Sequence, residues 1–434
     1  MPDQPATYFL ETLGCPKNQV DSDKLEGTMA VDGLVATARV EDADMVVINT
    51  CAFIDEARQE SIETILDLSS RRREGAKLVV TGCLAERHGA ELAAELPEID
   101  QIAGFGFAVS SPDSAVHVAL GPTRRAPDFD LLNLPRPASA RPWAYVKIAE
   151  GCDRACGFCA IPSFRGPQRS RSFDQILAEV DQLAAREIVL VAQDLAAYGR
   201  DQGVGERALV PLVQQVAERV ERVRLLYLYP SDLGDDLIDA ICDTGVPYFD
   251  LSLQHVSAPL LRRMRRWGDG EKFFDRIAAI RSHEPDAAFR SNFIVGYPGE
   301  TESDHDQLLD FVARAQLDWC GFFAYSEEDG TYAVTLDGAV PSALRDDRLG
   351  ELRELQDTIT ASKRDELIGR EVEILVDEPG IGRTHREAPE IDGIVSLPHD
   401  LEVGGIQTLT VIGAMGPDLQ AAPSDSLASI ETNR

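Results

Sequence analysis

Short apolar runs alternate with amphipathic stretches along most of the 434 residues of this chain, and this alternation restricts its fold more than any other feature. In the first hundred residues, three apolar runs suit β-strands, and a helical pattern follows each of them. These runs are TYFLETLGC (7–15), MVVINTC (45–51) and KLVVTGC (77–83). Strands that alternate with helices form parallel sheets covered by helices. We therefore predict an α/β domain with an open parallel sheet for residues 5–120.

A cysteine ends each of these three predicted strands. The C-terminal ends of parallel strands share one edge of the sheet, which is where ligands bind in such folds. We therefore expect Cys15, Cys51 and Cys83 to converge although they are far apart in the sequence. Three separate, buried structural cysteines remain the alternative.

Residues 121–142 contain five prolines, which predicts a linker between domains. The strand–helix alternation then resumes over residues 143–365. Six strand–helix units predict a parallel sheet curved into an incomplete barrel, a partial (β/α)6 barrel, with functional groups at the C-terminal ends of its strands. The six strand candidates are 145–152, 187–194, 224–230, 248–254, 289–296 and 320–326.

The C-terminal residues 366–434 have a different pattern. Apolar and polar residues alternate with a period of two, as in EVEILVDE and QTLTVIGAMG, and glycines are frequent. This pattern predicts a small antiparallel β-barrel.

The chain is strongly acidic, with 42 Lys and Arg against 74 Asp and Glu and a formal net charge of −32. Such a surface repels phosphate backbones, which disfavours non-specific nucleic-acid binding and favours a basic protein partner. No apolar run is long enough to span a membrane, and the first residues lack an export signal. We therefore expect a cytoplasmic protein without membrane association, whose eight cysteines serve metals, catalysis or burial.

Three further cysteines lie close together in GCDRACGFC, just after a predicted strand. Cys152, Cys156 and Cys159 have the spacing C-x3-C-x2-C, and thiolates in a short loop suit an iron–sulfur cluster. Three ligands leave one iron of a four-iron cluster open to a substrate or cofactor. A structural zinc site would need a fourth ligand, and no His or further Cys lies nearby. Chance clustering of buried cysteines is the remaining alternative.

This loop resembles the signature of the radical S-adenosylmethionine (SAM) superfamily, in which an aromatic residue, here Phe158, precedes the last cysteine. The resemblance implies that the open iron chelates the methionyl group of S-adenosylmethionine. Electron transfer then releases a 5′-deoxyadenosyl radical that abstracts a hydrogen from an unactivated carbon. The cofactor supplies this chemistry, while the protein orients it and excludes side reactions.

Nearly the whole chain resembles one family within that superfamily, the methylthiotransferases. The segments that carry the resemblance are LGCPKNQVDSD, INTCAFI, VTGCLAER and EGCDRACGFCAIPSFRG. It implies a three-cysteine N-terminal domain, a radical core and a C-terminal TRAM barrel. It also implies that Cys15, Cys51 and Cys83 hold a second [4Fe-4S] cluster, which carries the sulfur to be inserted. Cys242 and Cys320 match nothing in the family and are interpreted as small buried hydrophobes.

Polar residues at the ends of core strands are candidates for cofactor binding. VAQDLAAYG places Gln193 and Asp194 where related enzymes contact the methionyl group of S-adenosylmethionine. The GYPGE segment resembles one in which the backbone approaches the cofactor closely, because its glycines allow the turn. Completion of hydrogen-bond networks at strand ends is an equally good explanation for the remaining polar candidates. These remaining candidates are Gln254, Arg290 and Asn292, with Gly296 for the backbone approach and His255 as a weaker addition.

Two branches of the family differ in substrate. LGCPKNQVDS and REAPEIDG resemble the branch that modifies the β-carbon of an aspartate in small-subunit ribosomal protein twelve; the other branch modifies an adenosine of transfer RNA (tRNA). Residues 366–434 carry 13 Asp and Glu against 4 Arg and no Lys, a net charge of −9. A barrel that binds RNA needs cations, whereas a barrel that docks on a basic protein needs a negative net charge such as this one.

We therefore favour the ribosomal-protein branch, with a solubilising acidic surface as the alternative explanation of the charge. The expected partners are ribosomal protein twelve or the small ribosomal subunit, and an electron donor such as flavodoxin or ferredoxin. Direct tRNA binding is not expected. A tRNA adenosine methylthiotransferase is the alternative enzyme, and a non-catalytic iron–sulfur protein is a more distant hypothesis.

Overall fold

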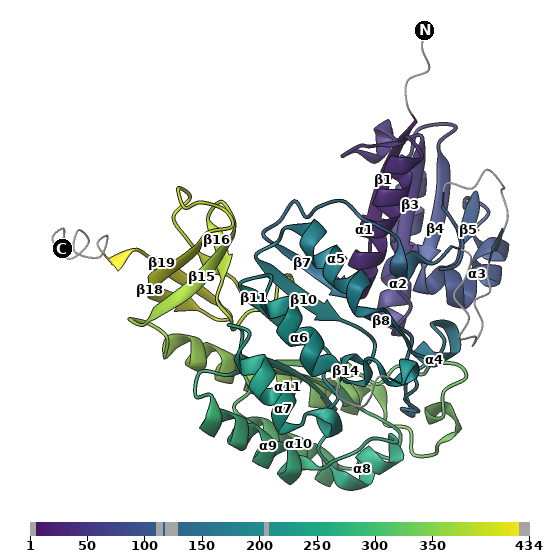
Figure 1. The fold of residues 1–434 in the computed structure, drawn as a ribbon. Helices are drawn as coiled ribbons and strands as arrows, with labels where there is room; N and C mark the ends of the chain where they lie inside the picture. The colour runs from purple at the N-terminus through teal and green to yellow at the C-terminus, as the bar shows by residue number, and fades with distance from the viewer. Residues whose placement is uncertain (1–5, 110–115, 118–128, 204–207, 425–434) are drawn as a thin grey trace.

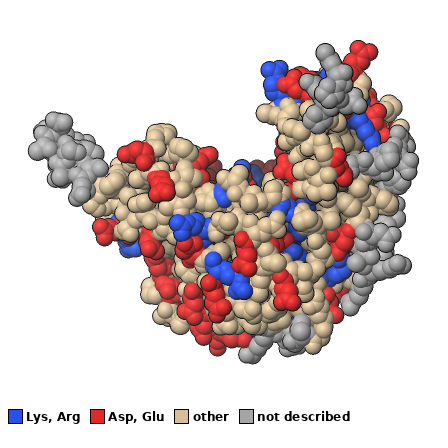
Figure 2. All heavy atoms as spheres, turned by 45° about the horizontal axis from the view of Figure 1, so that its top comes forward, with Lys and Arg blue, Asp and Glu red and all other residues tan. Residues whose placement is uncertain are grey.

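A computed structural model describes residues 6–109, 116–117, 129–203 and 208–424. Figure 1 shows an N-terminal sheet domain and a C-terminal barrel at opposite ends of a larger central core. Both rise from the same side of the core and leave a hollow between them (Figure 2). The predicted α/β fold class, with its open sheet, partial barrel and small β-barrel, is confirmed.

The N-terminal sheet has six strands in the order β2-β1-β3-β4-β5-β6, and every recorded pairing in it is parallel. All six residues of its central strand β3, MVVINT, are buried, as expected of a strand covered on both faces. The strands are β1 (Thr7–Thr12), β2 (Val35–Ala36), β3 (Met45–Thr50), β4 (Lys77–Gly82), β5 (Gln101–Ala103) and β6 (Val116–His117). The helices that follow β1, β3 and β4 are α1 (Pro16–Val31), α2 (Asp55–Arg71) and α3 (Cys83–Glu95).

The central core contains two three-stranded parallel sheets, β11-β10-β7 and β12-β13-β14. A parallel bridge between Leu228 and Leu251 joins them, so that they form the expected incomplete barrel. The strands are β7 (Trp143–Lys147), β10 (Glu187–Val191), β11 (Arg222–Leu225), β12 (Tyr248–Gln254), β13 (Ala288–Val295) and β14 (Trp319–Ala324). The helices are α5 (Phe173–Leu183), α6 (Leu209–Ala217), α7 (Asp235–Cys242), α8 (Ala258–Arg263), α9 (Gly270–His283), α10 (Glu302–Ala315) and α11 (Ser342–Asp365).

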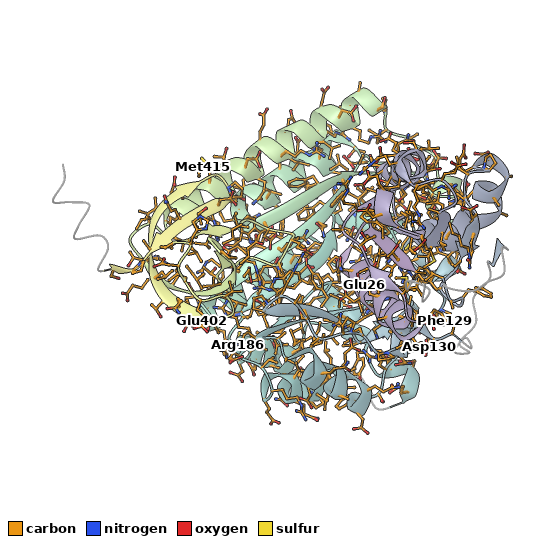
Figure 3. All side chains as sticks on the ribbon, turned by 90° about the horizontal axis from the view of Figure 1, so that it is seen from above. Glu26, Phe129, Asp130, Arg186, Glu402 and Met415 are labelled. Atoms are coloured by element: carbon orange, nitrogen blue, oxygen red, sulfur yellow. The ribbon has the colours of Figure 1, made fainter. Side chains whose placement is uncertain are left out.

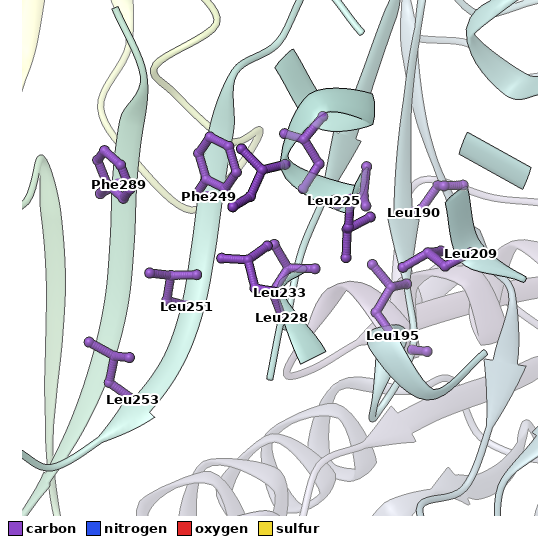
Figure 4. Close-up of a cluster of buried hydrophobic side chains, with 14 of the residues drawn as sticks. Leu190, Leu195, Leu209, Leu225, Leu228, Leu233, Phe249, Leu251, Leu253 and Phe289 are labelled. Carbon is purple, nitrogen blue, oxygen red and sulfur yellow. The ribbon is translucent and has the colours of Figure 1, made fainter. Parts of the chain in front are cut away.

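Apolar side chains on the outer face of the barrel strands form the main core (Figure 4). Leu190, Leu225, Phe249 and Phe289 come from four different strands and are fully buried. Each such side chain contributes about 1.5–3 kcal/mol when it leaves water. The alternate residues of the same strands point into the barrel, which leaves those positions available for polar groups.

Five strands form the closed C-terminal barrel, in the order β15-β16-β17-β19-β18. Its pairings are antiparallel except that of β17 with β19, which is parallel. The predicted antiparallel barrel thus contains one parallel contact, which the two-residue strand β17 makes with β19. The strands are β15 (Glu371–Glu378), β16 (Ile381–Arg383), β17 (Val395–Ser396), β18 (Ile406–Met415) and β19 (Asp418–Ala422).

The described part of the predicted linker, residues 129–142, packs tightly against both neighbouring units. Phe129 and Asp130 lie on the side of the N-terminal domain (Figure 3). Leu132 is buried, and its carbonyl accepts a 2.5 Å hydrogen bond from Lys24 of α1. The buried Arg136 pairs with Asp23 of α1 at 2.6 Å and with Glu179 of α5 at 3.0 Å. The described linker therefore acts as a wedge between the two units.

A segment of the C-terminal domain, residues 383–392, covers the N-terminal ends of the barrel strands. The Trp319 indole donates to the carbonyl of Arg386 at 2.7 Å. Glu187, at the start of β10, is fully buried and accepts from Arg224 at 2.8 Å and from Arg383 at 3.1 Å. The C-terminal barrel is thereby fixed to the core at the end opposite the expected functional edge.

Within the described residues, no helix combines the length and the apolar character needed to cross a bilayer. The longest, α11, is rich in charged residues, and its buried residues include Leu349 and Leu352, which lie one turn apart on the same side.

Replacement of Glu187 by Gln should destabilise the protein, because it leaves the buried Arg224 and Arg383 without their shared charge partner. We expect a loss of about 3 kcal/mol in the free energy of unfolding. Urea unfolding followed by tryptophan fluorescence measures this loss, since Trp143 and Trp319 both lie at this interface.

The matched control is Glu221→Gln, which removes an exposed pair with Arg186 and should cost less than about 1 kcal/mol. Burial raises the pKa of Glu187, but Arg383, Arg224 and Arg222 outweigh it and lower this pKa from 4.5 to about 2. The stabilisation from Glu187 is therefore complete above pH 4.5 and is lost as the pH falls from 4.5 towards 2. Equal stabilities of the two variants at neutral pH would contradict this account.

Candidate active site

Three neighbouring strands of the N-terminal sheet bring the first three cysteines to one edge. Cys15 precedes α1 as its N-cap, Cys51 directly follows β3, and Cys83 begins α3. The strands β1, β3 and β4 are adjacent and in register. Gly14 has a φ of +91°, and a Cβ at that position would lie 2.9 Å from the Sγ of Cys51. A glycine is therefore needed for the segment before Cys15 to pass so close to Cys51.

The three thiols lie close enough together for one to affect the pKa of another. Burial and, next, the neighbouring Cys83 and Cys15 together raise the pKa of Cys51 to about 12. Burial also raises the pKa of Cys15, but the ammonium of Lys17, the backbone amide of Asn18 and Arg165 outweigh it, and the net shift is downward. A metal cluster would supply the additional positive charge that three deprotonated thiols require at this edge.

The second cysteine set lies in a loop closed by a short hairpin that the sequence did not indicate. The strands β8 (Ala149–Glu150) and β9 (Arg169–Ser170) pair antiparallel on either side of residues 151–168. At the base of the loop the Cys152 amide donates to the carbonyl of Gly166 at 3.1 Å. Gly151 has a φ of +79°, and a Cβ there would lie 2.3 Å from the Pro167 carbonyl oxygen. The helix α4 (Ile161–Phe164) ends the cysteine run.

Within this loop each thiol is buried or receives a hydrogen-bond donor. Burial raises the pKa of Cys152 and of Cys159 to about 12, with Cys156 contributing to both shifts. The Arg154 amide lies 3.4 Å from the Cys152 sulfur, and the Arg266 guanidinium lies 3.4 Å from the Cys156 sulfur. Such donors stabilise the negative charge of cluster sulfurs. The loop therefore fits an iron–sulfur cluster.

Neither set converges like the ligands of a single ion: within the described part of the chain, no three His, Cys, Asp or Glu side chains could hold one metal ion. A four-iron cluster does not need such convergence, because each thiolate binds a different iron. The donor chemistry, with three thiols and no fourth ligand in each set, fits two such clusters.

Three of the predicted cofactor residues carry buried oxygens without a hydrogen-bond partner. These atoms are Oε1 of Gln193, Oδ1 of Asp194 and Oδ1 of Asn292. Buried polar atoms are nearly always paired in native proteins, so these three unpaired oxygens are candidates to receive a polar ligand. The opposite ends of two of these side chains are held in place: Gln193 donates to Glu150 at 2.6 Å, and Asp194 accepts from Arg154 at 2.5 Å. Asn292 faces the interior on β13 beside Gly321, where a Cβ would lie 2.6 Å from its oxygen.

The other predicted residues are placed differently. Gln254 ends β12 with a φ of +72°, and Gly296 follows β13 with a φ of +82° beside Arg345. Phe158 packs half-buried against the barrel core. Arg290 lies deeper in the barrel, paired with Asp250 at 3.2 Å and with Asp392 of the covering segment at 3.4 Å. The structure therefore groups Arg290 with two carboxylates rather than with the cysteine loop.

Outside the cysteine sets, two cysteines behave as structural groups, whereas His255 is buried with its Nε2 atom unpaired. The imidazole of His255 is fully buried, and burial lowers its pKa to about 4, so that it is neutral at physiological pH. Cys242 and Cys320 pack half-buried against the barrel core, and burial raises the pKa of both. This placement agrees with their interpretation as small hydrophobes.

Sequence reasoning missed the residue that joins the two cysteine sets. The Arg165 guanidinium donates to the sulfur of Cys83 at 3.1 Å and to Asn18 at 2.9 Å. Its other nitrogen reaches Asp21 and Glu150, both at 3.1 Å. The fully buried Lys147 also pairs with Asp21 and with Glu150. Arg165 lies in the cysteine segment EGCDRACGFCAIPSFRG, but nothing in the sequence indicates its partners 82 and 144 residues away.

Family profiles divide the chain as the structure does. An uncharacterized family, UPF0004, matches residues 7–104, the radical SAM superfamily matches residues 146–312, and the TRAM domain matches residues 368–423. The incomplete barrel, its cysteine loop and these matches together define the class of the molecule as a radical SAM protein with a TRAM barrel.

Curated relatives identify the family within that class. The chain is 42% identical to the ribosomal protein uS12 methylthiotransferase RimO of Nocardioides sp., over 95% of this chain and 96% of the relative. It is 43% identical to the protein of the same name from Moorella thermoacetica, over 91% and 93%. The chain therefore belongs to the RimO family of radical SAM methylthiotransferases.

Among solved structures, the chain resembles the radical SAM methyltransferase TsrM from Kitasatospora setae, solved with cobalamin and a [4Fe-4S] cluster bound. That comparison has 13% sequence identity and a TM-score of 0.49, and it covers 87% of this chain and 80% of TsrM.

We predict that each cysteine set holds its own cluster. Anaerobic reconstitution of the unaltered protein should give about eight irons per chain, four in each cluster. Joint replacement of Cys152, Cys156 and Cys159 by Ala should remove about half of the iron and all cleavage of S-adenosylmethionine, because the cofactor-binding iron is lost. Iron analysis and chromatography of 5′-deoxyadenosine measure the two effects.

Joint replacement of Cys15, Cys51 and Cys83 by Ala should remove the other half of the iron and leave cofactor cleavage in place. The control is Cys242→Ala with Cys320→Ala, which should retain all of the iron. If either triple variant still carries eight irons, the ligand assignment is wrong.

Proposed function

We propose that this protein uses two [4Fe-4S] clusters and S-adenosylmethionine to methylthiolate the β-carbon of an aspartate in ribosomal protein uS12. The observation that supports this most directly is the contact of Arg165 with both Cys83 and Glu150, which couples a three-cysteine edge to the neighbourhood of a second three-cysteine loop. A radical enzyme with a single cluster would not need the sheet edge that carries Cys15, Cys51 and Cys83. The names of the curated relatives support the substrate.

When bound, the clusters and cofactor supply the radical, the sulfur and the methyl group of the reaction. The chain's own residues hold these groups. The six cysteines would ligate the clusters, and the unpaired oxygens of Gln193, Asp194 and Asn292 would receive the cofactor. Reduction of the core cluster requires an electron donor such as flavodoxin or ferredoxin. A ribosomal substrate would place the reaction in the cytoplasm.

The C-terminal barrel would recognise the basic substrate protein. Acidic side chains are spread over the face shown in Figure 2, the C-terminal barrel included. Glu371, Glu373 and Glu378 are exposed along β15. Opposite charge attracts a basic protein and repels the backbone of tRNA. This charge favours the protein substrate over the alternative of a tRNA adenosine.

We expect the reconstituted protein to add one methylthio group to an aspartate of uS12 when dithionite and S-adenosylmethionine are supplied. Mass spectrometry of digested uS12 would locate the added mass. A uS12 variant with that aspartate replaced by Ala is the control and should remain unmodified. Modification of a tRNA adenosine with no change in uS12 would show that the substrate assignment is wrong.

Charge reversal on β15 should slow the encounter with uS12. The variant Glu371→Lys, Glu373→Lys, Glu378→Lys should associate about tenfold more slowly at low salt, and the difference should shrink as salt screens the charges. Asp377 is left unchanged, because it holds the buried Arg383 at 2.6 Å. Stopped-flow fluorescence measures the association rate.

The matched control reverses three exposed acidic residues on α11, Asp347, Glu354 and Asp357, and so changes the net charge equally. If both variants slow association to the same extent, net charge and not the barrel is responsible. Circular dichroism verifies that both are folded.

A further inference from the structure

Lys17 is a half-buried cation beside the first cysteine, and it lacks a carboxylate partner among the described residues. It lies in the first turn of α1, two residues after Cys15. Its ammonium rests 3.4 Å from the centre of the Tyr227 ring. Among the described residues, this ammonium has neither a carboxylate partner nor a hydrogen-bond acceptor.

The other cations near the two cysteine sets differ from Lys17 in this respect. Arg266 contacts the Cys156 sulfur and the Ser252 carbonyl, and the remaining cations are each paired with one or two carboxylates, which cancel their charge locally. The pairs are Lys147 and Arg165 with Asp21 and Glu150, Arg154 with Asp194 and Asp232, and Arg290 with Asp250 and Asp392.

The contact of Lys17 with Tyr227 places it where the N-terminal domain meets the barrel. Tyr227 follows β11, and its amide donates to Asp250 inside the barrel at 2.9 Å. Burial raises the pKa of Tyr227, and the next largest contributions come from Cys15 and then Asp250. The tyrosine therefore lies between the cysteine edge and the barrel interior. Its φ of +67° is strained for a bulky residue, and such strain persists where the surroundings fix a side chain in place.

We propose that Lys17 binds the side-chain carboxylate of the substrate aspartate, an inference that rests on the proposed function. The other cations of this region are already held by carboxylates, a sulfur or a carbonyl, so an incoming carboxylate requires a cation that is not already neutralised. Lys17 provides that charge, and the face of the Tyr227 ring orients the ammonium.

This assignment also explains how the β-carbon would be positioned. In aspartate the β-carbon is bonded directly to the carboxylate carbon. When Lys17 holds the carboxylate near Cys15, the β-carbon is only one bond from the carboxylate carbon. It therefore lies at the edge where the sulfur-carrying cluster would lie. The lysine acts in binding and positioning, and the hydrogen abstraction belongs to the cofactor.

The test compares Lys17→Met with Lys17→Arg, using uS12 and a uS12 variant in which the target aspartate is Asn. For the Met variant we expect kcat/KM on uS12 to fall at least about tenfold and the preference for Asp over Asn to disappear. The Arg variant should keep most of that preference, since it keeps the charge. Equilibrium binding to the reconstituted proteins can be measured with two peptides of uS12, one with the target Asp (the Asp peptide) and one with Asn in its place (the Asn peptide). The preference for the Asp peptide should be lost in the Met variant and mostly kept in the Arg variant. Lys272→Met, at an exposed lysine on α9, is the matched control and should behave as the unaltered protein does.

The outcomes separate this inference from the proposed function. If the unaltered protein modifies uS12 and Lys17→Met keeps the same kcat/KM and the same Asp preference, Lys17 does not bind the carboxylate, while the function stands. If Lys17→Met loses iron, the lysine acts through Cys15, and the inference is also overturned. If the unaltered protein leaves uS12 unmodified and binds the Asp and Asn peptides equally, both the function and the inference fail.

Discussion

The buried ion network around Arg165 is the interaction on which the arrangement of the site depends. Its members come from both the N-terminal domain and the core, and Asp21, Lys147 and Arg165 are nearly inaccessible to solvent. Each buried charge is costly without its partners, and removal of one partner typically costs about 3–5 kcal/mol. Separation of the two units would leave Asp21 without either cation and would deprive Lys147 and Arg165 of one of their two carboxylates. The network therefore makes one relative position of the cysteine edge and the cysteine loop strongly favoured.

A second ionic contact restrains the N-terminal domain from the other side of the barrel. Glu328, in the loop after β14, is buried and pairs with Arg58 of α2 and Arg87 of α3. In the same loop, the hydroxyl of Ser326 accepts from the Asp55 amide at 3.0 Å. Two contacts on separate core elements restrict rotation in a way that one contact does not. Because Glu328 binds the helices that follow β3 and β4, it also orients the strand ends that carry Cys51 and Cys83.

The sequence was sufficient to predict those features that depend on local pattern. Cys15, Cys51 and Cys83 could be placed at one edge because each ends an apolar strand, and the geometry of parallel sheets does the rest. Asn292 was a candidate because its segment FRSNFIVGYPGET resembles a family segment, and the structure places it within β13. The hairpin of β8 and β9 escaped prediction because two-residue strands have no periodicity. Arg165 and Lys17 escaped because their roles depend on contacts with residues far away in the sequence, such as Asp21 and Tyr227, and the proline-rich linker gave no indication that Arg136 is buried.

The excess of acidic residues has opposite consequences inside and outside the protein. With 42 basic against 74 acidic side chains, carboxylates are abundant enough to neutralise the cations that fold the site. The interior pairs of Lys147, Arg154 and Arg290 are all of this kind. An acidic substrate group can then be selected by a cation that folding has left without a carboxylate partner, and the ring of Tyr227 contacts Lys17 without neutralising it. Outside, the remaining carboxylates on the C-terminal barrel attract a basic protein as a whole. Recognition would thus use negative charge to attract the protein and one positive charge to select the residue.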